Sequence, residues 1–149
     1  MRVAGFVETA ANAEIQIPEA GFIRGKGPIS VTWLDLNRRL KKTGATGIFC
    51  ESDYSALTIL SLLQSVGIGV PGAVSVMGYG NLFFCLHTRP RLTSIEENLS
   101  GIGARAMNVL LKQIKSGKQV DPAENHLEYF APRLARRGST GTARQAGGK

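Results

Sequence analysis

Apolar residues recur every three or four positions in four stretches of the chain, and short apolar runs lie between these stretches. The helical spacing predicts four helices, over residues 3–11, 28–42, 54–66 and 98–115. The short runs predict strands over residues 22–23, 46–50, 74–77, 91–96 and 126–130. Strands that alternate with helices are typical of βαβ units, so the pattern predicts an α/β fold with a doubly wound, mostly parallel sheet.

Residues that begin and end helices flank these stretches. Gly44, Gly67 and Gly117 each follow one of them, and glycine readily adopts the left-handed conformation that terminates a helix. Asn98 opens the last stretch, where its side chain can cap the first backbone N–H groups. The first stretch has neither a strand nor a capping residue before it, and we therefore expect the chain to be a fragment of a longer protein.

Positive charge is concentrated near the C-terminus. The 149 residues include 18 Lys and Arg against 11 Asp and Glu, which gives a formal charge of +7. Residues 133–149 hold five of the basic residues and no acidic one, which leaves 13 basic and 11 acidic residues in the rest of the chain. Small and polar residues dominate from Gly138 onward, so we expect residues 141–149 to form a disordered, solvated basic tail. Weak contact with a polyanion is the less favoured alternative.

The sequence has no recognisable pattern of catalytic residues. Gly101, Gly103 and Ala106 match the spacing of a dinucleotide-binding loop, but they lie inside a predicted helix rather than between a strand and a helix. His87 and His126 belong to no recognisable catalytic triad or metal motif. The sequence therefore predicts a protein that is not an enzyme.

The two cysteines, Cys50 and Cys85, have no neighbouring His or Cys at metal-ligand spacing, so we expect no metal and no other cofactor. They are more typical of small core residues with reduced thiols. The sequence contains no signal peptide and no run of about 20 apolar residues that could span a membrane. These features favour a cytoplasmic protein of one ordinary domain, whose hydrophobic share of 43% is sufficient for a core.

Glu51, Ser52 and Asp53 follow a predicted strand and begin a predicted helix. Ligands of open α/β sheets bind at the carboxyl ends of the strands, so these residues are candidates for a binding site. Ser and Asp are also good N-cap residues, and for Asp53 taken alone capping is the favoured interpretation.

Five segments, taken together and in this order, resemble LacI/GalR-type transcriptional regulators. They are residues 2–6 (Arg-Val-Ala-Gly-Phe), 46–57, 67–79, 91–95 (Arg-Leu-Thr-Ser-Ile) and 136–140 (Arg-Arg-Gly-Ser-Thr). The resemblance implies a periplasmic-binding-protein-like sensor domain of type I, of which residues 1–140 are mainly the C-terminal lobe. It also implies that residues from about 96 to 122 cross to the other lobe, where the apolar stripe of the last helix has no sheet to cover.

The resemblance implies a role in transcription regulation. In that family the sensor domain binds a small effector, often a sugar or a nucleobase, and dimerises, while a separate helix-turn-helix head binds DNA. This chain has no such head, so we expect contact with DNA only through a missing N-terminal segment. We expect the effector-sensing and dimerisation part of a regulator of the repressor type. A dimerisation module without ligand binding is the alternative, and a solute-binding transport protein is less favoured.

The resemblance also implies an effector site made of Arg2, Ser52, Asp53, Tyr79, Gly80 and Asn81. Arg2 matches a family arginine that reaches the effector, whereas Ser52 stands where many members have an asparagine. Gly80 stands where the family usually has an aspartate, so a carboxylate that accepts hydrogen bonds from ligand hydroxyl groups is missing. These replacements predict weak effector binding.

Apolar residues nearly encircle the predicted helix over residues 54–66, which predicts a second buried surface besides the one that faces the sheet. The apolar run at residues 82–86 predicts a further exposed contact. We expect a homodimer interface that includes Trp33, Leu60, Leu63, Phe83 and Phe84.

Overall fold

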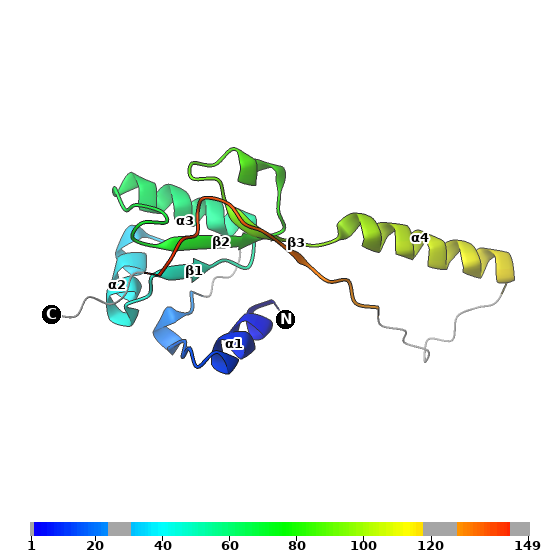
Figure 1. Cartoon of the computed structure of the whole chain (residues 1–149), viewed down its shortest axis with the longest axis horizontal. Coiled ribbons are helices and arrows are strands. Elements are labelled where there is room, and N and C mark those ends of the chain that lie inside the picture. The colour runs from blue at the N-terminus through cyan, green and yellow to red at the C-terminus, as the bar shows by residue number, and fades with distance from the viewer. Residues whose placement is uncertain (1, 24–30, 118–127, 144–149) are drawn as a thin grey trace.

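The computed structural model describes residues 2–23, 31–117 and 128–143 of the chain (Figure 1). The helices are α1 (Arg2–Asn12), α2 (Trp33–Thr43), α3 (Asp53–Ser65) and α4 (Leu99–Ser116). The strands are β1 (Gly47–Phe49), β2 (Ser75–Tyr79), β3 (Thr93–Glu96) and β4 (Arg133–Ala135). Two short 3-10 helices are also present, η1 (Glu19–Gly21) before α2 and η2 (Phe83–Leu86) between β2 and β3.

The four described strands form one sheet in the order β1-β2-β3-β4. β2 pairs in parallel with both β1 and β3, whereas β4 pairs with β3 in the antiparallel direction. Parallel neighbours need a crossover connection, and α3 supplies the crossover between β1 and β2. The predicted α/β fold with a mostly parallel sheet is confirmed.

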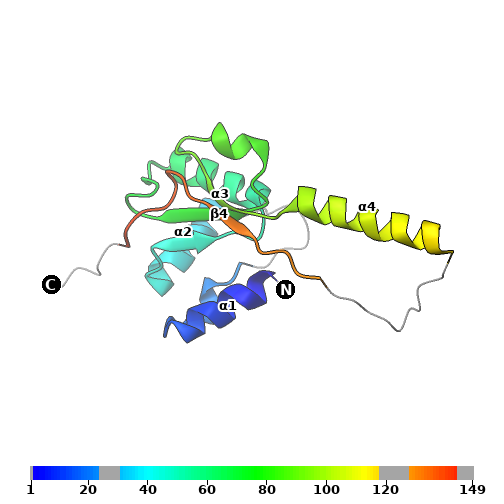
Figure 2. The ribbon, with the colours of Figure 1, turned by 45° about the vertical axis from the view of Figure 1, so that its right-hand side comes forward.

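Helices cover both faces of the sheet (Figures 1 and 2). Gly78 of β2 faces α3, because a Cβ atom at this position would meet the side chain of Ala56. On the opposite face, the ring of Phe6 in α1 stacks on the ring of Phe49 in β1, with the ring centroids 4.7 Å apart. This arrangement is the doubly wound layering that the sequence predicts.

The core lies between α3 and the sheet. Ile59, Leu60 and Leu63 of α3 are buried there together with Val76 of β2, and Leu36 brings α2 into the same cluster. Burial of one leucine or isoleucine side chain contributes about 1.5–3 kcal/mol, so this cluster supplies much of the energy that holds α2 and α3 on the sheet.

Capping residues set the ends of the helices close to the predicted positions. Ser52 caps α3 and Asn98 caps α4, each through a side-chain oxygen that accepts a hydrogen bond from a backbone N–H. Gly44, Gly67 and Gly117 follow α2, α3 and α4 with φ angles of 65°, 73° and 60°, which confirms them as terminating residues.

α2 begins later than the sequence predicts. Its N-cap is Thr32, whose hydroxyl oxygen accepts a hydrogen bond from the backbone N–H of Asp35 at 3.3 Å. Pro28, which we expected in the first turn, lies outside the described residues.

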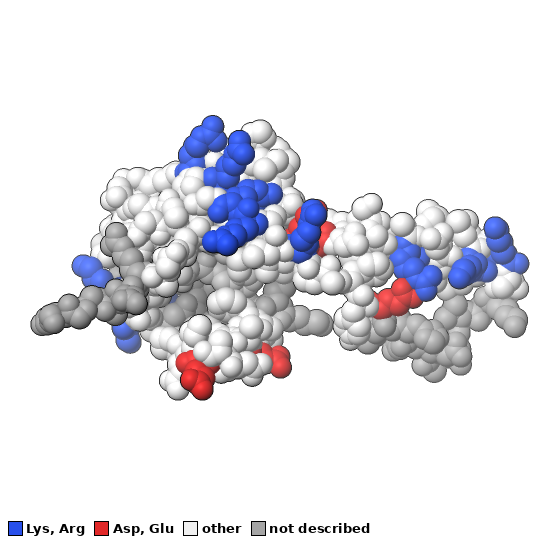
Figure 3. Space-filling view, viewed as in Figure 1, with Lys and Arg blue, Asp and Glu red and all other residues white. Residues whose placement is uncertain are grey.

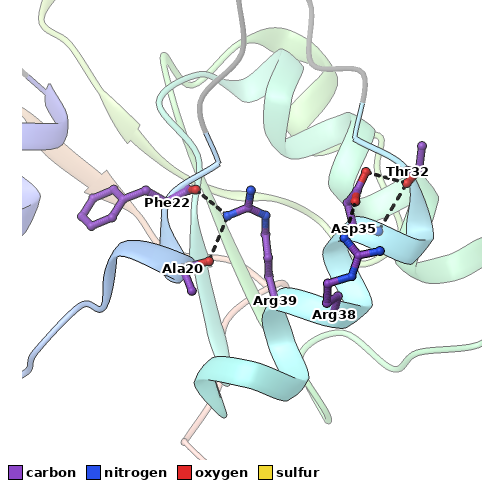
Figure 4. Close-up of polar contacts among 6 residues, drawn as sticks. All are labelled: Ala20, Phe22, Thr32, Asp35, Arg38 and Arg39. Carbon is purple, nitrogen blue, oxygen red and sulfur yellow. Dashed lines mark hydrogen bonds and ion pairs between the residues drawn. The ribbon is translucent and has the colours of Figure 1, made fainter.

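The predicted strand over residues 22–23 is wrong. Phe22 has an extended backbone (φ −90°, ψ 124°), but it belongs to none of the strands of the described sheet. Its carbonyl oxygen accepts a hydrogen bond from Nη1 of Arg39 at 2.7 Å, and the same nitrogen donates to the carbonyl oxygen of Ala20 at 3.0 Å (Figure 4). Arg39 thus fastens this segment to α2 instead of to the sheet.

The predicted last strand, over residues 126–130, is wrong for the part that the structure describes. Residues 128–130 form no strand, and residues 126–127 lie outside the described part. The last described strand is β4, and Arg133 at its start donates from Nη2 to Oε2 of Glu96 in β3 at 2.7 Å. Its pairing partner is distant in the sequence, so local patterning could not reveal it.

The C-terminal segment is attached to the fold further along than we expected. Ser139 is fully buried, and the backbone N–H of Gly141 donates to Oγ of Ser75 at 3.2 Å. Arg133, Arg136 and Arg137, three of the five basic residues near the C-terminus, therefore belong to the described fold and not to a tail. Residues 144–149 of the expected tail lie outside the described part.

α4 projects away from the rest of the molecule (Figures 1 and 2). None of its residues is buried. Its exposed apolar side chains are Leu99, Ile102, Met107, Val109, Leu110, Leu111 and Ile114. This exposure agrees with the expectation that the stripe has no sheet to cover. Within the described residues, no helix is long and apolar enough to cross a membrane.

Candidate functional site

The carboxyl ends of β1 and β2 and the beginning of α3 meet at one edge of the sheet. Residues 51–53 follow β1, and residues 79–81 end β2 and continue beyond it. We call these two segments the polar edge. In open α/β sheets this is the edge at which ligands bind, because the chain turns there between strand and helix and leaves a crevice.

Asp53 is the central anchor of the polar edge. Asp53 is 0% exposed, and both of its carboxylate oxygens accept hydrogen bonds. Oδ1 accepts a hydrogen bond from the hydroxyl of Ser94 in β3 at 2.6 Å, and Oδ2 accepts one from the backbone N–H of Leu82 at 2.7 Å. Asp53 therefore connects the start of α3 to β3 and to the segment that follows β2.

The carboxylate of Asp53 leaves no room for a side chain at the end of β2. A Cβ atom at Gly78 would lie 2.3 Å from Oδ1 of Asp53, and one at Gly80 would lie 3.4 Å from Oδ2. Gly80 also has a φ angle of 123°, which side chains rarely tolerate. The glycine at position 80 is thus required by the fold as it stands here.

Both cysteines are buried close to the polar edge, and both have raised pKa values. Burial raises the pKa of the Cys85 thiol to about 12, and a hydrogen bond to Asp53 adds to the effect. Burial also raises the pKa of the Cys50 thiol to about 12, with smaller contributions from the charges of Glu51 and Asp53. Both thiols stay protonated at neutral pH, in agreement with their interpretation as core residues.

Ser52 belongs to a small cluster of polar side chains at the start of α3. Its Oγ accepts a hydrogen bond from the backbone N–H of Ser55 at 3.3 Å and lies 2.9 Å from the Ser55 hydroxyl oxygen. Both hydroxyl groups donate to Oε1 of Glu51, at 3.2 Å from Ser52 and 2.9 Å from Ser55. Glu51 is exposed and Ser52 is half-buried, so this cluster is the part of the polar edge that a ligand can reach.

Asn81 is held in place from two sides. It has a positive φ angle of 51°, and its backbone N–H donates to Oγ of Ser94 at 3.0 Å. Its side-chain oxygen accepts a hydrogen bond from Nη2 of Arg137 at 2.5 Å. Because Ser94 in turn donates to Asp53, the two segments of the polar edge are linked through one serine of β3.

The C-terminal segment bonds the amino-terminal parts of β2 and β3 and reaches the polar edge through the bond from Arg137 to Asn81. Nη1 of Arg137 donates to the carbonyl oxygen of Leu92 at 2.6 Å. The hydroxyl of Ser139 donates to the carbonyl oxygen of Val76 at 2.6 Å and accepts from the backbone N–H of Thr93 at 2.8 Å. Residues 137–139 therefore join β2 to β3 through side-chain hydrogen bonds, which gives the sequence motif at residues 136–140 a structural role.

The structure brings most of the predicted effector residues together. Ser52 and Asp53 lie in one segment of the polar edge, and Tyr79, Gly80 and Asn81 form the other. Arg2 begins α1, but its side chain lies outside the described part, so its role stays a prediction.

Sequence analysis missed two residues of this site. Ser94 was quoted only as part of a motif, and nothing in the local sequence indicates that it bonds Asp53. Arg137 was counted as one of the five basic residues near the C-terminus, although it holds Asn81. The available signal for each was its position within a motif, Ser94 at residues 91–95 and Arg137 at residues 136–140.

The residues predicted for a dimer interface fall into two groups. Phe83 is 79% exposed, and its ring lies 5.8 Å from that of the half-buried Phe84; Trp33 is half-buried against the core. Leu60 and Leu63 are 2% and 0% exposed and belong to the core cluster. The sequence interpretation is therefore corrected for Leu60 and Leu63, because side chains that face the sheet cannot contact a second chain directly.

A groove of about 560 Å³ lies elsewhere, between η1 and α2. Its lining residues are Glu19, Ala20, Phe22, Asp35, Arg38, Arg39 and Lys42. None of the predicted effector residues lines it. Its lining runs along α2 from Asp35 in the first turn to Lys42 near the end, and it includes no residue of the polar edge. The described residues contain no cluster of His, Cys, Asp and Glu that could hold a metal ion.

Residues 1–140 match the family model described as the periplasmic binding protein-like domain. Among curated relatives, the chain is similar to the HTH-type transcriptional repressor PurR of Actinobacillus pleuropneumoniae, with 32% identity over 140 residues. That alignment covers 91% of this chain but 41% of the relative, so the chain spans less than half the length of that repressor.

Solved structures of regulators also resemble the chain. A putative transcriptional regulator of the LacI family from Sanguibacter keddieii is 28% identical with a TM-score of 0.76, and the match covers 95% of this chain and 52% of that one. The transcription regulator CcpA of Lactococcus lactis is 27% identical with a TM-score of 0.71, over 94% of this chain and 50% of that one. The relatives named here are regulators rather than enzymes.

Proposed function

Because the chain belongs to the periplasmic binding protein-like domain family, as the LacI-family regulators do, we propose that it is the effector-sensing and dimerisation part of a DNA-binding transcriptional repressor. The observation that carries this proposal is the polar edge, which lies at the carboxyl ends of parallel strands in a chain that matches the family over residues 1–140. DNA binding would reside in another part of the regulator, and the regulator would act in the cytoplasm.

The effector would be a small sugar-like or nucleobase ligand. Glu51 and Ser52 offer a carboxylate and a hydroxyl that are accessible and already oriented by hydrogen bonds to each other. Such groups suit the hydroxyl or N–H groups of a sugar or a base, because the carboxylate accepts hydrogen bonds and the hydroxyl can accept or donate them. Asp53 would act by holding the polar edge in position, since its own oxygens are engaged within the fold.

Two segments of the chain would carry the effector signal: the one that leaves β3 for α4 and the one that returns to β4. We call these two segments the crossings. The chain leaves the sheet from β3 into α4 and returns through β4, so both crossings lie side by side near the polar edge (Figure 1). An effector at this edge would favour one orientation of the part beyond the crossings, and this shift in population would change the spacing of DNA-binding heads in a dimer.

Dimerisation would use the apolar surface at η2. Phe83 and Leu86 are 79% and 48% exposed, and Tyr54 packs on Phe84 with the ring centroids 5.2 Å apart. Exposed aromatic residues of this kind are enriched at protein interfaces. Trp33, half-buried in the first turn of α2, stays a further residue predicted for the interface.

A dimerisation module that binds no ligand is the second candidate. Two observations favour it: Gly80 offers no side chain to a ligand, and the carboxylate of Asp53 is inaccessible. The site would then have lost two of its usual polar anchors, each worth about 1–3 kcal/mol. A solute-binding protein for transport remains the less favoured alternative.

Thermal unfolding with a panel of sugars and nucleosides at millimolar concentration separates these candidates. A ligand present at 100 times its Kd stabilises the folded chain by about 2.7 kcal/mol, which raises the midpoint by several degrees. We expect stabilisation by at least one ligand, and we expect the variant Ser52→Ala to reduce it while Lys41→Gln does not. If no ligand of the panel raises the midpoint, the effector-sensing function is rejected for this chain and the dimerisation module is favoured.

A further inference from the structure

Four arginines from two distant parts of the sequence form one surface, which we call the arginine patch: Arg89, Arg91, Arg136 and Arg137. The hydrogen bond from Arg137 to the carbonyl oxygen of Leu92 brings the two parts together. Gly138 also packs closely, since a Cβ atom there would lie 3.4 Å from the side chain of Pro90. Figure 3 shows a group of Lys and Arg side chains on the part of the molecule that holds the sheet.

No acidic residue neutralises the arginine patch from within either segment. Residues 82–95 and 129–143 contain no Asp or Glu. Glu96, the first acidic residue after the loop, is already paired with Arg133. Among the described residues, Arg91 and Arg136 have no hydrogen-bond or ion-pair partner, and Arg89 donates only to the carbonyl oxygen of its neighbour Thr88.

The guanidinium groups differ in their roles. Arg89, Arg91 and Arg136 are exposed, whereas Arg137 is half-buried and engaged by Leu92 and Asn81. Arg137 therefore holds the two segments together, and the other three carry charge that faces solvent. Clustered like charges destabilise a fold slightly, so nothing in the folding of this chain accounts for three unpaired arginines on one surface.

The size and surroundings of the patch favour a protein segment over a nucleic acid. Three exposed guanidinium groups can neutralise only about three phosphates, whereas duplex-binding proteins commonly contact about 6–10. Leu86 is 48% exposed in the same loop. The backbone N–H of Leu92 donates a hydrogen bond to the carbonyl oxygen of Cys85 at 2.9 Å, which keeps this loop compact beside the patch. Arginines next to an apolar side chain are typical of protein interfaces, and guanidinium groups bind carboxylates in a bidentate manner.

We propose that the arginine patch, with Leu86 at its border, binds an acidic segment of a partner protein through its carboxylates. The patch meets the surface proposed for dimerisation at Leu86, but its arginines lie outside that surface, because two copies meeting at the patch would bring like charges together. It is also distinct from the polar edge, whose accessible side chains are Glu51 and Ser52.

Fluorescence anisotropy with fluorescein-labelled hexaglutamate at low salt tests this proposal on the full 149-residue chain. The double variant Arg91→Gln/Arg136→Gln removes two exposed charges of the patch. The double variant Lys41→Gln/Lys42→Gln removes two exposed charges at the end of α2 and is the matched control. We expect the patch variant to bind at least tenfold more weakly than the unaltered chain and the control variant to lose less than twofold. Equal thermal midpoints for both variants would establish that folding is intact.

Four results would overturn the proposal. The first is that hexaglutamate at millimolar concentration does not bind, and the second is that both variants lose the same affinity for it. The third is that a random 20-base-pair duplex binds more tightly than hexaglutamate and that the patch variant abolishes this binding. The fourth is that the patch variant forms a weaker homodimer in light scattering without peptide. The second result would assign the binding to net charge, the third to nucleic acid and the fourth to a second copy of the chain.

Discussion

The hydroxyl of Ser94 donates a hydrogen bond to Oδ1 of Asp53 over 2.6 Å, and the two residues are 41 positions apart in the sequence. Asp53 begins α3, which follows β1, and Ser94 lies in β3. The bond therefore reaches across β2, which lies between β1 and β3 in the sheet. The same serine oxygen accepts the backbone N–H of Asn81. One buried pair thus sets the geometry of the whole polar edge.

Replacement of Asp53 by Asn should destabilise the fold. The amide nitrogen of Asn cannot accept the hydrogen bond that one carboxylate oxygen now accepts, so either Ser94 or the N–H of Leu82 loses its buried partner. An unsatisfied buried group costs about 1–3 kcal/mol, and urea denaturation measures this loss directly. Ser94→Ala should cost a similar amount, whereas Glu51→Gln at an exposed position should change the free energy of unfolding by less than about 0.5 kcal/mol. Equal stability of Asp53→Asn and the unaltered chain would contradict the anchoring role.

A methyl group at position 78 should be poorly tolerated. In Gly78→Ala the new Cβ would lie 2.3 Å from Oδ1 and 3.2 Å from the Cα of Asp53, so the helix and the strand would have to separate. Overpacking of this kind costs about 1–3 kcal/mol. The control is Gly47→Ala in β1, where nothing lies within 4 Å of the added Cβ. Thermal or urea unfolding of the two variants should differ by at least about 1 kcal/mol, and a neutral Gly78→Ala would be inconsistent with the described packing.

The two buried thiols should make stability fall at alkaline pH. Burial raises the pKa of both Cys50 and Cys85 from 9.0 to about 12, so between these values the unfolded chain releases thiol protons that the folded chain retains. The unfolded state is then favoured, and this contribution to stability, complete below pH 9, is lost as the pH rises toward about 12. Urea denaturation at pH 8 and pH 10.5 measures the loss.

The control for the pH dependence is the double variant Cys50→Ala/Cys85→Ala, which should lose less stability between the two pH values because no thiol remains to titrate. Native thiols should also react slowly with a thiol reagent at pH 8 and quickly once the chain is unfolded. Rapid reaction of both cysteines in the folded chain would show that they are accessible and would refute the burial argument.

Two truncations should have very different effects. Among residues 141–143, which the structure describes, removal of residues 141–149 takes away one exposed hydrogen bond, from Gly141 to Ser75, and we expect the fold and any dimer to stay unchanged within about 1 kcal/mol. Removal of residues 137–149 also deletes Arg137 and Ser139, whose side chains join β2 to β3, and should cost several times more. Circular dichroism melting compares the two chains. A large loss from the shorter truncation would mean that the last residues pack on the fold after all.

The backbone of α4 should exchange its amide hydrogens quickly in a monomer. None of its residues is buried, so its hydrogen bonds depend on an isolated helix of 18 residues, which is marginally stable in water. The amides of α3, whose apolar side chains enter the core, provide the internal comparison and should exchange far more slowly. Slow exchange throughout α4 in a chain that light scattering identifies as monomeric would disprove this expectation.

Local features of the sequence were sufficient to predict the helices. Asn98 and Gly117 enclose α4, and Gly44 ends α2, because capping and left-handed glycines depend only on neighbouring residues. Strands depend on partners that local sequence does not contain. Residues 22–23 look like a strand but are bound by Arg39, and β4 lies further along the chain than its predicted position because β3 selects its partner.

The candidate site was predictable only as two separate pieces. The family resemblance identified Ser52, Asp53 and the segment after β2, but it could not reveal that Asp53 is inaccessible or that Ser94 links the pieces. The apolar residues around α3 indicated two buried surfaces, one on the sheet and one on a second chain, but not which residue belongs to which surface. Leu60 and Leu63 are buried in the core. In both cases the missing information was three-dimensional contact between distant positions.

The bonds that Ser139 makes with Val76 and Thr93 have a consequence for the biogenesis of the protein. The central pair of strands, β2 and β3, is complete in sequence long before Ser139 is synthesised, but until then a buried carbonyl and a buried N–H lack their partner. A nascent chain still held by the ribosome must keep this region open or protected until Ser139 has emerged. A premature stop codon between residues 136 and 139 would therefore release a chain prone to aggregation, even though every described helix and strand had already been translated.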